Sequence, residues 1–294
     1  MAESFSEQLD VFTHRATESD VLVEVCDMSR GRVRAFRGQL RGPYCQRAKT
    51  LPASFPIGRC QCDEKVSQCA TLLVTEPCYW TPELPMLYDV ELELELADGT
   101  TAAWRHTLGL RRWEIDGRRL FWERRRIVLR GIVAEDCTSE ILPAAAEAEV
   151  ALVVRDPDES FMQRASDLGV PLMADLRGYS GDLTPKLLSY AWQPSVALVL
   201  VDDRVASAHY KPHAVKIGCV FSPAYGFAAA DWADVIVIEL HETERPPAWA
   251  ATCAKPVIAI RRGEAYAELA EARRGCDRLQ AVLAPQFDLA GYFV

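Results

Sequence analysis

Eight short apolar runs follow one another after residue 126, and they constrain the fold more than any other feature. The runs are continuously apolar rather than alternating, which is typical of strands that are covered on both faces, as in a parallel sheet. Segments with helical character separate several of them, at 139–148, 160–168 and 265–280. This alternation predicts a (β/α)8 TIM barrel. The runs are 127–132, 150–154, 170–174, 196–201, 214–220, 235–238, 256–260 and 289–294.

The predicted barrel is small. Residues 117–294 are fewer than the ~200–250 residues typical of such barrels, so the connections between strands must be short. The alternative for the same pattern is an open, doubly wound sheet.

The preceding residues have a different pattern, which is that of an antiparallel β-structure. Residues 88–96 alternate apolar residues with acidic ones, the period-2 signature of a half-buried strand. An Asp98-Gly99 turn and the returning residues 101–107 complete a hairpin. A second hairpin is predicted over 113–122. We therefore predict an immunoglobulin-like β-sandwich over 1–116 and a compact (β/α)8 barrel over 117–294.

The charge balance and the apolar pattern exclude several classes of protein. The chain of 294 residues has 33 basic and 42 acidic side chains and a formal net charge of −9, whereas a nucleic-acid-binding protein normally has a basic surplus. The first residues lack the features of a signal peptide, and no apolar stretch approaches the ~18 residues of a membrane span. A cytoplasmic protein with neither nucleic-acid nor membrane partners is predicted.

Ten cysteines are present. In a cytoplasmic protein they are expected to stay reduced. Cys60, Cys62, Cys69 and Cys78 could together supply four zinc ligands, but C-x-C with loose onward spacing is a weak zinc signal. Buried structural thiols are the favoured interpretation, and we predict no metal and no cofactor.

The junction between the two predicted domains carries a family resemblance. Residues 78–88, Cys-Tyr-Trp-Thr-Pro-Glu-Leu-Pro-Met-Leu-Tyr, resemble the "W-x-P-x-x-P-x-L-Y" strand entry of family 2 glycoside hydrolases, which include β-galactosidases, β-glucuronidases and β-mannosidases. Residues 108–117 resemble the segment that leaves their sandwich, and 124–132 resemble their first barrel strand. Segments similar to later barrel strands of the family follow in the same order, so the resemblance extends from about residue 70 to 294.

The resemblance implies a catalytic site that is altered at two positions. Retaining glycosidases need two carboxylates, one as acid/base and one as nucleophile. The alignment gives Asp203 at the acid/base position, with a side chain one methylene shorter than the family's Glu. Asp202 replaces the Asn that precedes it, and Arg261 stands at the nucleophile position. A guanidinium cannot act as that nucleophile, because it is permanently protonated.

Other polar residues follow the predicted strands and would lie at the same mouth of the barrel. Arg155, Asp175 and Glu239 are candidate substrate-binding residues together with Asp202 and Arg261. Arg155 and Arg261 could hold an anionic group of a ligand. The alternative is that Arg261 forms an ion pair with Asp202 or Asp203 and fills an inactive pocket.

Three functions are compatible with this pattern. The first is a catalytically inactive glycoside-hydrolase homologue with a carbohydrate-binding or assembly role, whose ligand is a carbohydrate or an anionic small molecule. The second is an active but reorganised O-glycosyl hydrolase that acts on an unusual glycoside through Asp202, Asp203 or Glu239. The third is a zinc-dependent interaction module. Exposed sandwich edges could also support a homo-oligomer.

Overall fold

A computed structural model describes most of the chain and divides it into two compact units. The first unit comprises Met1–Arg111, Gly181–Pro194 and His209–Val215, and the second comprises Arg112–Ser180, Ser195–Ala208 and Lys216–Val294. The described residues are 5–14, 16–29, 31–59, 69–134, 138–202, 212, 214–221, 231–241, 243–263 and 266–294.

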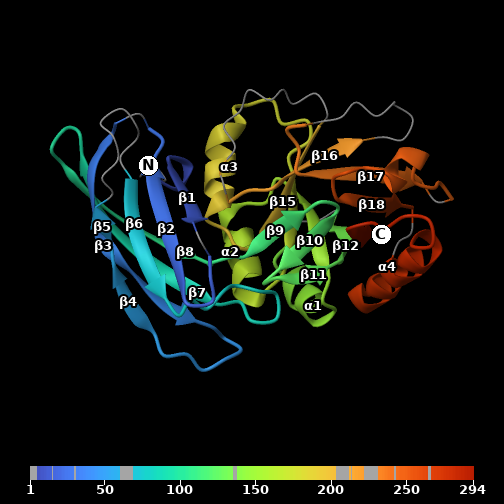
Figure 1. Ribbon diagram of the computed structural model, residues 1–294, viewed down its shortest axis with the longest axis horizontal. Coiled ribbons are helices and arrows are strands. Elements are labelled where there is room, and N and C mark those ends of the chain that lie inside the picture. The colour runs from blue at the N-terminus through green and yellow to red at the C-terminus, as the bar shows by residue number, and fades with distance from the viewer. Residues whose placement is uncertain are drawn as a thin grey trace. The chain divides into compact units, whose positions relative to one another are not determined.

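The first unit contains a β-sandwich, as predicted. Its two sheets have four antiparallel strands each, in the orders β1-β2-β6-β5 and β4-β3-β7-β8 (Figure 1). The strands are β1 (Leu9–His14), β2 (Asp20–Asp27), β3 (Val33–Tyr44), β4 (Ala53–Pro56), β5 (Gly58–Arg59), β6 (Cys69–Thr75), β7 (Leu87–Leu96) and β8 (Thr101–Leu108).

Strand β7 shows why this part of the chain forms a sandwich. Val90, Leu92 and Leu94 are buried on one face of the strand. Glu91 points away from them and approaches Arg105 of the neighbouring strand β8, with 3.6 Å between the charged atoms. One face of the strand is thus in the core, because successive side chains of a strand point to opposite faces.

The expectation that every cysteine is a free thiol is wrong at two positions. Cys26 of β2 and Cys69 of β6 form a disulfide. The antiparallel register places the two residues directly opposite each other, so their side chains lie on the same face of the sheet. Cys69 is therefore not available as a zinc ligand in this form, and Cys60 and Cys62 lie outside the described residues.

Helix α3 (Leu183–Ala191) belongs to the first unit, although it follows a barrel strand in the chain. The Asp182 carboxylate caps the helix by accepting a hydrogen bond from the Thr184 amide at 2.9 Å. The helix packs against β1 and the 3₁₀ turn η1 (Phe5–Glu7). At its C-terminal end the buried Trp192 indole donates to the Leu9 carbonyl at 3.0 Å.

The second unit contains a closed barrel of eight parallel strands, which confirms the TIM-barrel prediction and excludes the open sheet. Closure is made by β12, which pairs with β13 on one side and with the last strand, β19, on the other. The strands are β12 (Leu129–Ala134), β13 (Ala151–Arg155), β14 (Leu172–Asp175), β15 (Val196–Asp202), β16 (Ile217–Phe221), β17 (Val235–His241), β18 (Val257–Arg262) and β19 (Gly291–Phe293).

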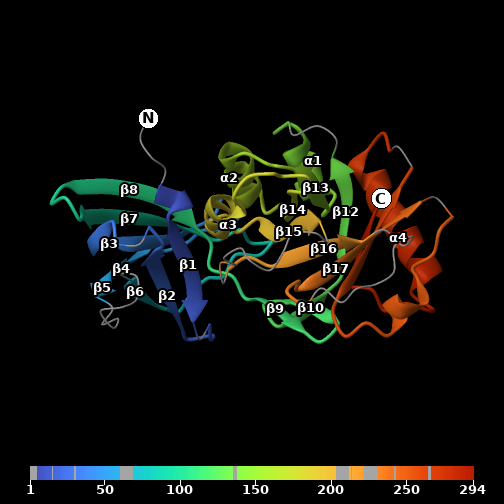
Figure 2. The ribbon, with the colours of Figure 1, turned by 90° about the horizontal axis from the view of Figure 1, so that it is seen from above.

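The helices of this unit lie outside the strands. Helices α1 (Ile141–Glu147) and α2 (Glu159–Leu168) lie side by side, and α4 (Leu269–Leu283) packs on β12 and β19 (Figure 2). A 3₁₀ turn, η2 (Ala248–Ala251), lies between β17 and β18. The predicted hairpin over 113–122 is present as β9 (Trp113–Asp116) and β10 (Arg119–Trp122).

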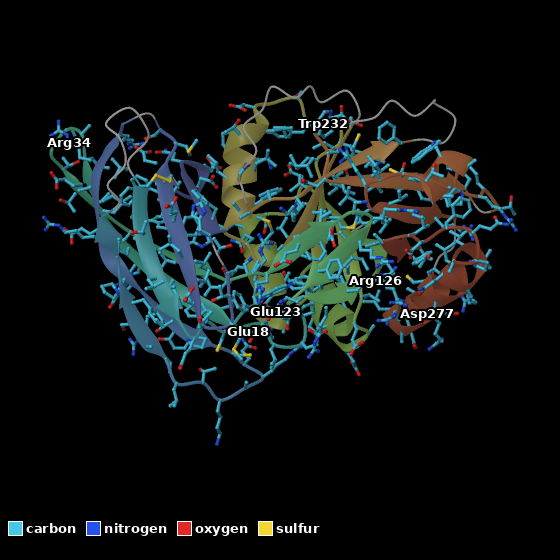
Figure 3. The ribbon with its side chains drawn as sticks, viewed as in Figure 1. Glu18, Arg34, Glu123, Arg126, Trp232 and Asp277 are labelled. Atoms are coloured by element: carbon cyan, nitrogen blue, oxygen red, sulfur yellow. A yellow bond between two sulfur atoms is a disulfide. The ribbon has the colours of Figure 1, made fainter. Side chains whose placement is uncertain are left out.

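Strand β11 (Arg125–Ile127) adds to this hairpin and leads into the barrel. Its Arg126, labelled in Figure 3, donates to the Asp288 carboxylate at 2.5 Å. Arg130 of β12 donates to Asp277 of α4, also labelled there, at 2.6 Å. These ion pairs link the hairpin and the first barrel strand to the C-terminal part of the unit.

None of the helices in the described ranges combines the length and the apolar character that crossing a membrane requires.

Candidate functional site

The candidate residues lie at one end of the barrel because its strands are parallel. Arg155, Asp175 and Asp202 are the last residues of β13, β14 and β15. Glu239 and Arg261 lie close to the ends of β17 and β18 and are paired in register with Ile260 and Leu240. In barrels of this type the carboxyl ends of the strands form the active-site face.

Arg177 connects two of the carboxylates across this mouth. It lies two residues after β14 and donates two parallel hydrogen bonds to the Asp175 carboxylate, from Nε to Oδ1 at 2.9 Å and from Nη2 to Oδ2 at 2.6 Å. Its third nitrogen, Nη1, is 2.9 Å from Oε1 of Glu239 on β17. All three nitrogens of the planar guanidinium therefore contact a carboxylate: Nε and Nη2 contact Asp175, and Nη1 contacts Glu239.

The electrostatic effect of this arrangement is to hold Arg177 in its charged form. Hydrogen bonding to Asp175, followed by the charges of Asp175 and Glu239, raises the pKa of Arg177 above its usual value, while partial burial opposes the rise. The guanidinium is therefore a permanent cation between two acids.

Glu239 is also engaged by a second arginine. Arg262, the last residue of β18, donates from Nη2 to Oε1 of Glu239 at 2.8 Å and from Nε to the same oxygen at 3.1 Å. One carboxylate oxygen thus accepts from two guanidinium groups. We call Asp175, Arg177, Glu239 and Arg262 the mouth network. In this network two carboxylate groups are matched by two guanidinium groups of opposite charge.

A second group of residues lies at the ends of β13 and β15. The Asp202 carboxylate accepts a hydrogen bond from the Gly178 amide at 2.8 Å. Gly178 has a positive φ of 75°, a conformation that glycine adopts without strain. A Cβ placed there would be 4.0 Å from Nη2 of Arg155. Arg155, Gly178 and Asp202 therefore meet at this side of the mouth.

The contact of Arg261 in the structure is with a backbone carbonyl, and its alternative pairing with Asp203 lies outside the described residues. Nη2 of Arg261 donates to the carbonyl oxygen of Glu244 at 3.2 Å. The Glu244 carboxylate in turn accepts from the His241 amide at 3.0 Å, which closes a turn after β17. Asp202 accepts its hydrogen bond from the Gly178 amide in the loop after β14. Asp203 lies outside the described residues.

The chemistry available to the described residues follows from these contacts. Both oxygens of Asp175 are bound by Arg177, and Oε1 of Glu239 accepts from Arg177 and Arg262, so both acids of the mouth network are paired with guanidinium groups. Among the described residues, no group of three or more His, Cys, Asp or Glu side chains has an arrangement that could hold a metal ion.

Arg177 and Arg262 are site residues to which the sequence analysis gave no role. The signal for Arg177 is its position two residues after a strand that ends in Asp175, a spacing that lets a side chain fold back onto the carboxylate. Nothing in the sequence identifies Glu239 as its second partner, because that contact depends on barrel closure.

The structure is thus a β-sandwich followed by a closed (β/α)8 barrel, with charged residues gathered at the carboxyl ends of the barrel strands, where TIM-barrel sites lie. No protein-family model matches the sequence, and no curated protein is similar enough to match it. Solved structures do match.

The matching structures include a family 2 glycoside hydrolase and several β-glucuronidases. Lactobacillus rhamnosus β-glucuronidase superposes with a TM-score of 0.65 at 12% identity, over 97% of this chain and 60% of that one. Dictyoglomus thermophilum β-D-glucuronidase gives 0.61 at 14% identity, over 97% and 61%. Eisenbergiella tayi family 2 β-galacturonidase, solved with galacturonate bound, gives 0.56 at 12% identity, over 97% and 64%.

These likenesses confirm the predicted resemblance at the level of the fold. The chain shares its sandwich-and-barrel architecture with family 2 glycoside hydrolases, and it spans less than two thirds of the length of these structures.

Proposed function

We propose that this chain is a catalytically inactive homologue of family 2 glycoside hydrolases that keeps the fold for a binding or assembly role. The observation that carries the proposal is the contact of Arg177 with both Asp175 and Glu239. A guanidinium that pairs with two carboxylates across the mouth engages acids that a glycosidase would keep available for proton transfer or nucleophilic attack. Arg261 at the expected nucleophile position supports the same conclusion.

The alternative is a reorganised O-glycosyl hydrolase that uses Asp202, Asp203 or Glu239. Glycosidases of both stereochemical classes need one carboxylate that is free to exchange a proton with the leaving group or with water. Oε1 of Glu239 accepts from two arginines and Oδ2 of Asp202 accepts from a backbone amide. These contacts disfavour the alternative for both residues, and Asp203 is its remaining candidate.

Hydrolysis assays separate the two functions. The purified protein is incubated with nitrophenyl β-glucuronide, β-galacturonide, β-galactoside and β-mannoside, beside an Asp203→Ala variant prepared identically. We expect equal, background release of nitrophenol from both. Saturable release by the wild type that disappears in Asp203→Ala would overturn the inactive assignment.

Further variants test the other candidate acids of the alternative. Asp202→Ala and Glu239→Ala should leave the background unchanged, as should Glu91→Ala, a matched carboxylate deletion in the sandwich. A loss of measurable turnover in the first two variants but not in the third would support the reorganised hydrolase.

The ligand class that we propose is a carbohydrate, or another small molecule, with an anionic group. The support is the presence of Arg155 and Arg261 at the same end of the barrel, since arginine binds carboxylates with two parallel hydrogen bonds. Calorimetric titration with glucuronate and galacturonate, against glucose and galactose, tests this directly. We expect the uronates to bind and the neutral sugars not to bind.

Arginine variants locate that binding. Arg155→Gln and Arg261→Gln should each weaken uronate binding at least tenfold, whereas Arg105→Gln on the exposed surface of the sandwich should leave it unchanged. Equal affinity for neutral and acidic sugars, or binding that survives both mouth substitutions, would contradict the proposed ligand class.

We also propose two domains, at 1–116 and 117–294, and a cytoplasmic protein that associates with copies of itself but not with nucleic acid or membranes. Unpaired edge strands such as β8 support self-association. Light scattering at several concentrations tests it, and a mass equal to one chain throughout would exclude the homo-oligomer.

A further inference from the structure

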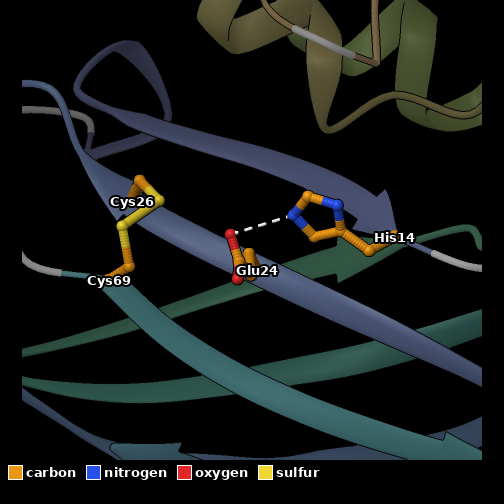
Figure 4. Close-up of a disulfide and its surroundings, with 4 residues drawn as sticks. All are labelled: His14, Glu24, Cys26 and Cys69. Atoms are coloured by element: carbon orange, nitrogen blue, oxygen red, sulfur yellow. Dashed lines mark hydrogen bonds and ion pairs between the residues drawn. A yellow bond between two sulfur atoms is a disulfide. The ribbon is translucent and has the colours of Figure 1, made fainter. Parts of the chain in front are cut away.

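The Cys26–Cys69 disulfide is the starting point, because it joins two strands that are already neighbours in one sheet. Cys26 is the next-to-last residue of β2 and Cys69 is the first residue of β6, 43 positions further along the chain. Figure 4 shows the bond lying across the two strands. It therefore stands at the end of the β2–β6 ladder, where strand pairing stops.

The other connections of β2 do not depend on this bond. Strand β1 is linked to β2 by the contact between Nε2 of His14 and Oε2 of Glu24, at 3.1 Å (Figure 4). The turn from β2 to β3 is held by Asp27, which is fully buried and accepts hydrogen bonds from the amides of Ser29 at 2.8 Å and Val33 at 3.0 Å. Besides the backbone ladders, separate contacts thus connect β2 to β1, to β3 and to β6, and only the contact with β6 is covalent.

The two cysteines are not equally buried. Cys26 has 7% of its surface exposed, whereas Cys69 is half-buried at the start of its strand. Thiol–disulfide exchange requires a thiolate to approach one sulfur of the bond, so its rate depends on access to that sulfur. Attack on Sγ of Cys69 is therefore the open route, with Cys26 as the leaving thiol.

We propose that Cys26–Cys69 is a reversible redox switch that ties and releases the start of β6 at the end of its ladder with β2. A dithiol reductant supplies two electrons and two protons: one of its thiolates attacks Sγ of Cys69 and displaces Cys26, and its second thiol then resolves the mixed disulfide. The products are two free cysteines in the protein and one disulfide in the reductant. Oxidation by a small-molecule disulfide reverses the same steps.

The structural consequence of reduction is local. Without the bond, the start of β6 keeps its ladder to β2 but loses its covalent tie, and strand ends open more readily than strand centres. The connections through His14–Glu24 and Asp27 remain, because they contain no sulfur. The reduced protein should thus loosen at β6, whereas β1, the β2–β3 turn and the barrel keep their protection.

Peptide-resolved thiol labelling tests the chemistry in the native protein. The full chain is equilibrated in buffers with different ratios of reduced to oxidised dithiothreitol, alkylated without denaturant, digested and analysed by mass spectrometry. We expect Cys26 and Cys69 to become alkylated together as the buffer becomes more reducing, and to be protected again on reoxidation. Two cysteines that stay unmodified under native reducing conditions, or that never form the bond in oxidising buffer, would overturn the proposal.

Hydrogen exchange tests the structural consequence on the same samples. Reduction should speed the exchange of amides at the start of β6 at least tenfold, leave β13 and β14 unchanged, and lower the melting temperature by roughly 10 °C. A Cys26→Ser/Cys69→Ser variant should match the reduced protein in every buffer. A Cys45→Ser/Cys78→Ser variant, which removes two free thiols of the same unit, should keep the full redox response. Uniform acceleration over both units would contradict a local switch.

Discussion

Arg177 and Glu239 come from opposite parts of the barrel mouth, yet Nη1 of the arginine lies 2.9 Å from Oε1 of the glutamate. Arg177 follows β14 and Glu239 lies in β17, with β15 and β16 between them in the barrel. The guanidinium also binds Asp175 beside it. The Arg177 side chain thus connects Asp175 and Glu239, which lie on different strands and are 64 positions apart in the chain.

The mouth network should contribute measurably to stability. Replacing Arg177 by Met keeps much of its apolar stem and leaves Asp175 and Glu239 without their shared cation. We expect a loss of about 2 kcal/mol in the free energy of unfolding, in the range of hydrogen bonds to charged groups, measured by urea denaturation. The control is Arg105→Met, whose exposed ion pair with Glu91 should be worth less than about 0.5 kcal/mol. Equal losses in the two variants would mean that the network is no stronger than a surface pair.

The strands of the barrel could be predicted from sequence for a physical reason. A strand covered on both faces must be apolar on both faces, so its sequence is a short continuous run, and all eight predicted runs overlap barrel strands. Helix α3 was missed because Pro185 interrupts its pattern. Proline is nevertheless tolerated in the first turn of a helix, and Asp182 before it is a capping residue that indicates a helix start.

The candidate site was less predictable, because its contacts are long-range. The rim residues could be named from their positions at strand ends, but the sequence does not say which guanidinium reaches which carboxylate. The sequence left open whether Arg261 binds a ligand or pairs with Asp202 or Asp203, and in the structure it donates to the Glu244 carbonyl. That partner is created by the turn after β17, a local backbone feature that apolar patterning does not encode.

Gly131 is required where the barrel closes. In the register of β12 it stands opposite Ala151 on one side and Phe293 on the other. A Cβ at this position would meet the Ala151 carbonyl oxygen at 2.2 Å and Cε1 of Phe293 at 2.4 Å. Because a backbone atom cannot move aside cheaply, Gly131→Ala should cost about 3 kcal/mol, at the upper end of overpacking effects. Thermal and urea unfolding measure this loss.

The matched control for Gly131 is Gly58→Ala. A Cβ there would lie at an ordinary contact distance of 3.5 Å from Oγ1 of Thr71, so we expect a change within about 0.5 kcal/mol. A Gly131 variant as stable as the Gly58 variant would show that the barrel closes less tightly than described.

Tyr88 completes the segment that carries the family resemblance. Its hydroxyl accepts from the Cys78 amide at 2.8 Å and donates to the Cys78 carbonyl at 3.3 Å, which closes the segment into a loop. Tyr88 is almost fully buried, and burial raises the pKa of its hydroxyl above the usual value, so it stays neutral at physiological pH. Tyr88→Phe should cost about 1–2 kcal/mol, because it removes both hydrogen bonds without changing the ring.

Tyr44→Phe is the comparison for that variant, since Tyr44 lies in the same sheet and is only half-buried. Urea denaturation of the two variants should give a clearly larger loss for Tyr88→Phe. A loss that is no larger would mean that the loop is held by its prolines and not by the tyrosine hydroxyl.

The cap of helix α2 should make a pH-dependent contribution to stability. The Asp158 carboxylate accepts hydrogen bonds from the Phe161 amide at 2.8 Å and the Ser160 hydroxyl at 2.9 Å, and these bonds hold the pKa of Asp158 below its usual value. A carboxyl with a lowered pKa in the folded state stabilises the fold above the unfolded pKa of ~3.9, and this contribution is lost as the pH falls through the folded pKa. Asp158→Ala should therefore cost about 1 kcal/mol at pH 7 and less at pH 3.

Asp158→Asn separates the charge from the cap. Its side-chain oxygen still accepts from the Phe161 amide but has no ionisation to lose, so its stability relative to the wild type should improve as the pH falls. Free energies of unfolding of the three proteins at pH 7 and pH 3 give the comparison, in which titration of all other groups cancels. If Asp158→Ala were equally destabilised at both pH values, ionisation of the Asp158 carboxyl would contribute nothing to the stability of the fold. The cap would then act only through hydrogen bonds that do not depend on its charge.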